Sequence, residues 1–213
     1  MDAILERNYA RPKIVTEPVK MTGTPKSFRW TVREYYQMAE LGFFNGRRVQ
    51  LIKGELIEMS PMKSTHAMSI QLAFELLVKI FGKGFVVRQQ LPLALSKTDE
   101  PEPDIAIVEG TARDFSRAHP KTARLIVEIS DSTLRFDRFD RDRKEKAALY
   151  AKNRIEEYWI LNLKERCLEV YRRPVKDRNL GFVYTEIFVV CETEIVSPFA
   201  RPNSKLKVAN MLP

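Results

Sequence analysis

Hydrophobic residues along the chain follow two periods, one typical of helices and one typical of strands. Apolar positions three or four apart predict an amphipathic helix that has Ser64 or Thr65 as its N-cap and is ended by Gly82 and Gly84. A capping threonine and helix propensity predict shorter helices at residues 31–42 and 142–153. Short β-branched runs predict strands or extended chain at residues 47–61 (two strands around a Lys53-Gly54 turn), 85–96, 104–110, 125–130, 156–163, 167–173, 182–190 and 193–198. This order of elements predicts a mixed sheet with helices packed against it, the α/β class.

Two of the predicted strands carry a carboxylate although both of their faces are otherwise apolar. In "DIAIV" (104–108) the two isoleucines share one face, and Asp104 shares the other with an alanine and a valine. In "LIVEIS" (125–130) Glu128 shares its face with an isoleucine and a serine, opposite three aliphatic residues. Strands that are apolar on both faces are typical of the centre of a covered sheet.

A carboxylate in such a place must be paired, protonated or bound to a cation. Asp104 and Glu128, at the ends of adjacent strands, would form a hard-oxygen site suited to Mg²⁺ or Mn²⁺. Purely structural roles stay open as well, because Asp104 could hydrogen-bond a turn after Pro103 and Glu128 could pair with an arginine.

The helix predicted after Glu128 adds Lys144 and Lys146. A lysine beside a metal site can stabilise the charge that develops during phosphodiester hydrolysis. Either lysine alone would ordinarily be a solvated surface residue, so the indication of chemistry comes from the ordered set of aspartate, glutamate and lysine.

Charge and length narrow the classes of function. The 213 residues include 36 Lys and Arg against 28 Asp and Glu, and the net charge of +8 favours an anionic partner, of which nucleic acid is the commonest. The length suits one compact domain at residues 28–213, preceded by an N-terminal arm at residues 1–27.

Several classes of protein are excluded by what the chain lacks. No apolar run approaches the roughly 20 residues of a membrane span, and the N-terminus lacks the order of a signal peptide, so we expect a cytoplasmic protein without a membrane partner. Cys167 and Cys191 show no metal spacing and are expected to be reduced. The absence of a glycine-rich phosphate loop, a Ser-His-Asp order and a Cys/His cluster argues against kinase-like, triad-hydrolase and zinc chemistry.

Four segments of the chain resemble a known family. "PEPDIAIV", "LIVEISDST" and "KAALYAKNRIEEYWIL" are similar to the signature segments of the Uma-type restriction endonucleases, a branch of the PD-(D/E)XK nuclease superfamily. "GELIEMSPMKSTHAMSI" resembles the N-terminal block of that family, and the resemblance covers residues 31–173. It implies a restriction-endonuclease-like fold, with Asp104 and Glu128 as ligands of Mg²⁺ or Mn²⁺. It also places Glu55 near the cleft as an accessory residue, ahead of Glu58.

The lysine of the site departs from the superfamily pattern. The usual place, two residues after the glutamate, is Ser130 here, and in the Uma-type pattern the lysine comes from the next helix, four residues before a tyrosine. That rule selects Lys146, ahead of Tyr150, whereas helix geometry alone leaves Lys144 open. The family's accessory acid is represented by Asp137 or Asp142, so the loop before this helix is longer than usual.

His66 and Gln90 are further candidates. His66 stands at a helix N-terminus, where a capping or packing role competes with a catalytic one, and Gln90 could point at the metal site. The combined prediction is a metal-dependent DNA endonuclease whose basic segments bind the phosphate backbone. Cutting both strands usually takes two active sites, so a homodimer is expected, through the strands from Tyr158 onward or the N-terminal arm. The alternative is a catalytically silent nuclease-fold protein that binds nucleic acid or a protein partner.

Overall fold

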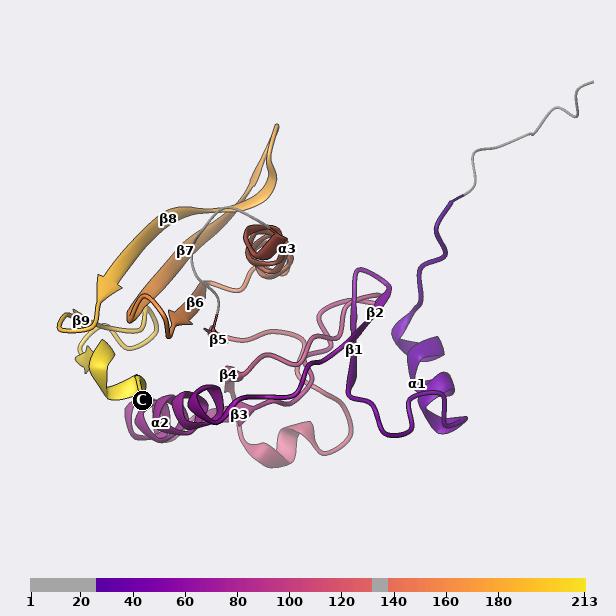
Figure 1. The fold of residues 1–213 in the computed structure, drawn as a ribbon, viewed down its shortest axis with the longest axis horizontal. Coiled ribbons are helices and arrows are strands. Elements are labelled where there is room, and N and C mark those ends of the chain that lie inside the picture. The colour runs from indigo at the N-terminus through magenta and orange to yellow at the C-terminus, as the bar shows by residue number, and fades with distance from the viewer. Residues whose placement is uncertain (1–25, 132–137) are drawn as a thin grey trace, which may run out of the picture.

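A six-stranded mixed sheet lies at the centre of the fold. The computed structural model describes residues 26–131 and 138–213, and within 138–142 it describes the helix backbone without the side chains. The sheet has the order β3-β4-β5-β6-β7-β8 (Figure 1). Its strands are β3 (Phe85–Gln89), β4 (Ile105–Glu109), β5 (Leu125–Ser130), β6 (Glu157–Asn162), β7 (Cys167–Asp177) and β8 (Gly181–Cys191). β5 and β6 run parallel, and the other neighbouring pairs run antiparallel. The predicted α/β class is confirmed.

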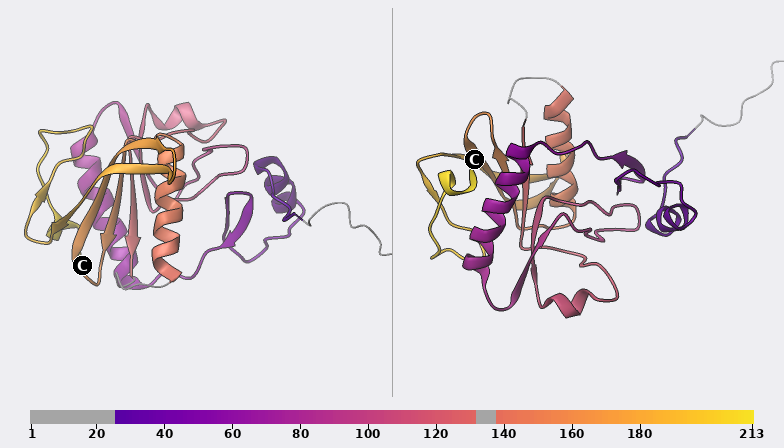
Figure 2. Two further views of the ribbon diagram at one scale, coloured as in Figure 1. Left: turned by 90° about the horizontal axis from the view of Figure 1, so that it is seen from above. Right: turned by 60° about the horizontal axis from the view of Figure 1, so that its bottom comes forward.

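One long helix covers each face of this sheet, and Figure 2 shows them on opposite sides. α2 (Ser64–Phe81) packs its apolar stripe, which includes Ile70 and Leu77, against the aliphatic face of β4 and β5. α3 (Arg138–Lys152) supplies the crossover that the parallel β5–β6 pair requires, and it buries Leu149 and Tyr150 on the opposite face. The alternation expected for the two central strands is confirmed, because the isoleucines of β4 face α2 while Ala106 faces α3.

Smaller elements surround the sheet. They are α1 (Val32–Glu40), the hairpin of β1 (Val49–Ile52) and β2 (Glu55–Glu58), the 3₁₀ helices η1 (Ala112–Phe115) and η2 (Val208–Met211), and the pair of β9 (Ile195–Val196) with β10 (Leu206–Lys207). Thr31 caps α1 and forms a capping box with Glu34, as expected for a helix that opens on threonine. α3 begins at Arg138, four residues before the predicted start. The N-cap of α2 is Lys63, so the predicted cap at Ser64 or Thr65 is wrong, and both of these residues lie in the first turn of the helix.

Contacts with neighbouring segments hold the β1–β2 hairpin beside the chain that leads to Asp104. Gly54 has a φ of +72°, and a Cβ there would lie 2.8 Å from the Arg29 side chain, so the turn requires glycine. The Gly54 amide donates to the Thr98 carbonyl, and Leu51 forms a bridge with Glu100. The hairpin therefore lies beside Asp104, the residue that precedes the first residue of β4.

The two cysteines are directly opposite each other in the β7–β8 ladder, and they form no disulfide with each other. Within residues 26–131 and 138–213, no helix has the length and apolar character that crossing a membrane requires.

Candidate active site

Asp104 and Glu128 meet at one end of the β4–β5 pair. Ile105 is opposite Val127 in the antiparallel ladder, so one further step places Asp104 opposite Glu128 on the same face of the sheet. The two strands are linked there, because the Ile129 amide donates to Asp104 Oδ2 at 2.8 Å. Both carboxylates are largely buried and line a cleft of about 460 Å³. The prediction that these strands are neighbours is confirmed.

Two residues of α3 hold Glu128. Lys146 Nζ lies 3.2 Å from Glu128 Oε1, and the buried Tyr150 hydroxyl donates to the same oxygen at 2.7 Å. The two residues are four apart in sequence, so they share one side of the helix. Burial raises the pKa of Glu128, and Lys146 and Tyr150 offset only part of that effect. The positive charge of Lys146 therefore matters for keeping this carboxylate ionised.

A second set of side chains holds Asp104. His66 Nε2 lies 3.2 Å from Asp104 Oδ2, and Gln90 Nε2 donates to Oδ1 at 3.4 Å. Burial would raise the pKa of Asp104, but the His66 hydrogen bond and the Ile129 amide outweigh burial and lower the pKa. Asp104 is therefore an anion at neutral pH.

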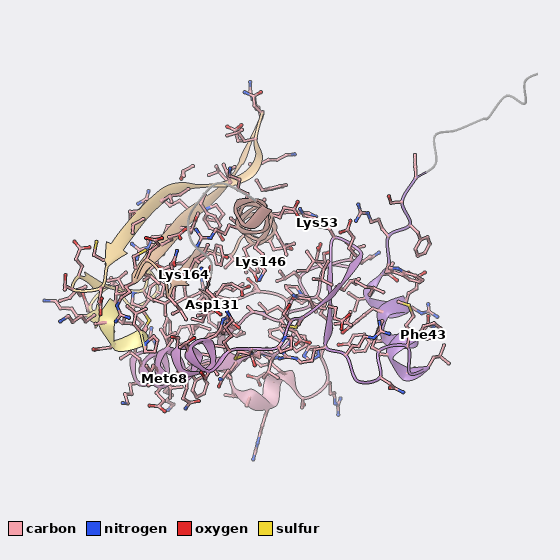
Figure 3. All side chains as sticks on the ribbon, in the orientation of Figure 1. Phe43, Lys53, Met68, Asp131, Lys146 and Lys164 are labelled. Carbon is pink, nitrogen blue, oxygen red and sulfur yellow. The ribbon has the colours of Figure 1, made fainter. Side chains whose placement is uncertain are left out.

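His66 connects Asp104 to a third acid. Its Nδ1 lies 3.6 Å from Asp131 Oδ2, in the residue that directly follows β5. Burial would lower the pKa of His66, but the hydrogen bond to Asp104 and the charges of both aspartates raise it. Figure 3 shows Lys146 and Asp131 near the centre of the molecule, between α3 and α2. The first turn of α2, the end of β5 and the middle of α3 thus converge on one cleft.

The donor set of this cleft fits a hard divalent cation. Glu128 Oε2 takes no hydrogen bond from any described residue, and Asp104 Oδ1 receives only the long bond from Gln90. No group of three or more His, Cys, Asp or Glu side chains suited to a metal occurs among the described residues. Mg²⁺ is commonly held by one or two carboxylates, with waters and substrate phosphates completing its octahedron. Asp104 and Glu128 therefore suit Mg²⁺ or Mn²⁺ better than a closed zinc site.

The structure separates the remaining candidates. Lys144 lies on the other side of α3, where it lines a second cavity between that helix and β8. Glu55 is exposed, forms an ion pair with Arg29 and is not among the residues that line the cleft, and Glu58 is likewise exposed and outside it. Asp137 lies outside the described residues, as does the side chain of Asp142.

Three features of the site were not anticipated from sequence. Asp131 could have been noticed as the polar residue that follows a buried strand. Tyr150 was used only to select Lys146 by spacing, and its hydrogen bond to Glu128 was not foreseen. Arg48 and Lys63 line the cleft from loops beside the β1–β2 hairpin and α2. Nothing in their local sequence distinguishes them from other surface cations.

Comparisons with known proteins identify the family of this chain. A family model, Uma2, described as "Putative restriction endonuclease", matches residues 32–198. This chain belongs to the Uma2 family. The Uma2 match runs from α1 to just beyond β9 and so includes every residue of the cleft described above. No curated protein matches the chain.

A solved structure shares the fold. It is the crystal structure of a putative nuclease belonging to DUF820 from Anabaena variabilis ATCC 29413, with a TM-score of 0.63 and 12% sequence identity. The alignment covers 85% of this chain and 96% of that chain. At this identity the likeness establishes the fold alone. Together with the Uma2 assignment, it confirms the restriction-endonuclease-like fold implied by the four sequence segments.

Proposed function

We propose that this Uma2 protein is a Mg²⁺- or Mn²⁺-dependent endonuclease that hydrolyses DNA phosphodiester bonds. The supporting observation is the convergence of Asp104, Glu128 and Lys146 from two adjacent strands and a crossover helix into one open cleft. Family membership and fold make a nuclease the first expectation, and the cleft contains the chemical groups that such a reaction needs.

The residues of the cleft divide the chemical tasks. Asp104 and Glu128 would hold the cation, which when bound supplies a Lewis acid for the phosphodiester. The Ile129 amide, His66 and Gln90 fix the orientation of Asp104. Tyr150 fixes Glu128 by a hydrogen bond to one of its oxygens.

Lys146 has a separate task. Its ammonium group lies beside Glu128 and at the edge of the cleft, where it can stabilise negative charge that develops on the phosphate. Lys146 takes the role of the superfamily lysine. The usual position of that lysine is occupied here by Ser130, which lines the same cleft.

The entrance of the cleft suits a phosphate backbone. Arg48 and Lys63 line it, and Lys63 is also the N-cap residue of the 18-residue helix α2. The Lys63 side chain makes no capping hydrogen bond, so the first amides and the positive dipole end of α2 are suited to binding an anion. These groups are not specific for base sequence, so we expect affinity for DNA that falls steeply with added salt. We further propose that the protein acts in the cytoplasm as a homodimer, because cutting both strands takes two sites.

A cleavage assay with matched variants tests the proposal. Supercoiled plasmid and a linear duplex are incubated with the protein and Mg²⁺ or Mn²⁺. Asp104→Asn and Glu128→Gln should each lower the rate at least about 100-fold, since either change removes a charged ligand. Glu75→Gln is the control, because Glu75 is exposed on α2 and hydrogen-bonded only to Gln71 among the described residues.

The outcomes separate the two candidate functions. A chelator should abolish cleavage, and circular dichroism should show that both variants remain folded. Equal cleavage by wild type and both carboxylate variants would mean that another nuclease contaminates the preparation, and the proposal would fail. DNA binding without cleavage by the wild-type protein in either metal would support the silent nuclease-fold alternative.

A further inference from the structure

β8 is a long edge strand of the sheet. It is 11 residues long, and its outer side pairs with no strand among the described residues. Its sequence, "GFVYTEIFVVC", contains no proline and a single charged residue, Glu186. Edge strands are normally shortened, bent or charged, because their free amides and carbonyls otherwise pair with another chain. β8 lacks the charges and prolines that would block such pairing.

The opposite edge of the sheet is built differently. β3 has only five residues. The Arg201 guanidinium lies 4.5 Å from the centre of the Phe85 ring and donates to the Phe81 carbonyl, so the C-terminal segment packs against the corner where α2 ends and β3 begins. The two edges therefore differ in length, with five residues in β3 and 11 in β8.

Apolar side chains extend the β8 edge into a surface. Ile187 and Val189 are 58% and 55% exposed, and as alternate residues of a strand they share one face. Leu180, at the turn before β8, is 75% exposed. Leu180 and Ile187 also line the cavity of about 440 Å³ between α3 and β8, together with Tyr171 and Phe182. A contiguous apolar surface beside an open strand is typical of a protein–protein contact.

We propose that β8 pairs antiparallel with β8 of a second copy of this chain, about a two-fold axis near Ile187. A two-fold axis lets identical edges satisfy each other's amides and carbonyls without any other partner. In this register Ile187 faces its own copy, and Thr185 faces Val189. These cross-strand pairs are β-branched and favourable.

The charges of β8 are compatible with this pairing. Glu186 would face Phe188 of the second copy, so the single carboxylate of the strand does not meet another carboxylate. Glu186 is also neutralised within its own chain, at 3.0 Å from Arg173 and 4.0 Å from Arg172. An axis perpendicular to the sheet keeps α3, and with it Lys146, on the same face in both copies.

This interface rests on the homodimer of the proposed function, and its test is independent of cleavage. Sedimentation velocity at micromolar concentration should show a dimer for the full chain. Ile187→Lys and Val189→Lys place a charge in the paired surface and should weaken dimerisation at least 100-fold. Both side chains are exposed in the single chain, so the fold should survive. Phe43→Lys is the control, because Phe43 is 65% exposed near α1, and that variant should remain a dimer.

A cysteine introduced at the axis tests the register. In a Cys191→Ser background, Ile187→Cys should form an intermolecular disulfide under mild oxidation, and Phe43→Cys should not. A dimer that resists both lysine substitutions and gives no crosslink at position 187 would overturn this interface and leave the homodimer standing. A monomeric wild-type chain would overturn both.

Discussion

Replacing Lys146 by alanine is the sharpest test of how the cleft works, because the chain contains its own control. Lys144 is two residues away, which places it about 200° around the helix from Lys146. Lys146 contacts Glu128 in the cleft, whereas Lys144 lines the cavity on the β8 side. The two variants remove the same charge from the same helix, and they differ in which cavity loses it.

The expected loss follows from the position of the ammonium group. Lys146 Nζ lies 3.2 Å from a carboxylate oxygen and its side chain is 23% exposed. That position lets the ammonium group contact a phosphate held at the cleft carboxylates. Removing one group that stabilises developing charge typically costs about 2.7–4 kcal/mol, so we expect about 3 kcal/mol of lost transition-state stabilisation. That corresponds to a rate about 100-fold lower.

Single-turnover cleavage of a labelled duplex measures this loss without interference from product release. Lys146→Ala should cut at least about 100-fold more slowly, while its affinity for DNA falls only slightly, since one contact among many contributes little. Lys144→Ala should cut at nearly the wild-type rate. Normal cleavage by Lys146→Ala would refute the role given to this lysine, and a loss confined to Lys144→Ala would assign the role to the other lysine.

Three further predictions concern stability. Tyr150→Phe should destabilise the fold by roughly 1.5–3 kcal/mol in urea denaturation, because the buried Glu128 loses a hydrogen bond. An unchanged urea midpoint would show that this hydrogen bond does not stabilise the fold. Leu77→Ala should cost about 2–5 kcal/mol, since Leu77 is fully buried between α2 and the sheet, and a smaller loss would indicate looser packing there. Burial raises the pKa of Glu157 despite its Phe199 amide and Arg172 partners, so the folded state binds the extra proton. The contribution of Glu157 to stability is complete below its unfolded pKa of about 4.3 and is lost as the pH rises through its raised folded pKa. Relative to Glu157→Gln, the free energy of unfolding of the wild type should therefore fall over that pH window. Parallel plots of unfolding free energy against pH for the two proteins would contradict this.

Local patterns were sufficient to predict most of the fold. The period of two in "DIAIV" and "LIVEIS" gave the correct faces for both strands, because a covered central strand leaves its residues no other arrangement. The amphipathic stripe of α2 and the capping threonine of α1 gave those helices to within a residue or two. The start of α3 was missed by four residues, because the charged segment "RFDR" has no apolar stripe to reveal a helix.

The functional site was harder to predict from the sequence than the fold, because the contacts of the site join segments that are far apart in the chain. Asp104 and Glu128 could be paired in advance, since each is the acid of a strand that is otherwise apolar on both faces, and such strands are expected side by side at the centre of the sheet. His66 reaches Asp104 across 38 positions of sequence, and no local pattern distinguishes that contact from a helix cap. Glu55 was expected near the cleft, but tertiary contacts of the β1–β2 turn with Arg29 and Thr98 direct this residue into solvent. Those contacts are invisible in strand periodicity.

The position of a bound cation would test the account most directly. A crystal grown with Mn²⁺ and examined by anomalous diffraction should show a peak coordinated by carboxylate oxygens of both Asp104 and Glu128, with Lys146 beside it. Glu128→Gln crystals treated in the same way should lose that peak. If Mn²⁺ occupied only surface carboxylates while Glu128 stayed paired with Lys146 and Asp104 with His66, the cleft would not be a metal centre and the proposed chemistry would be wrong.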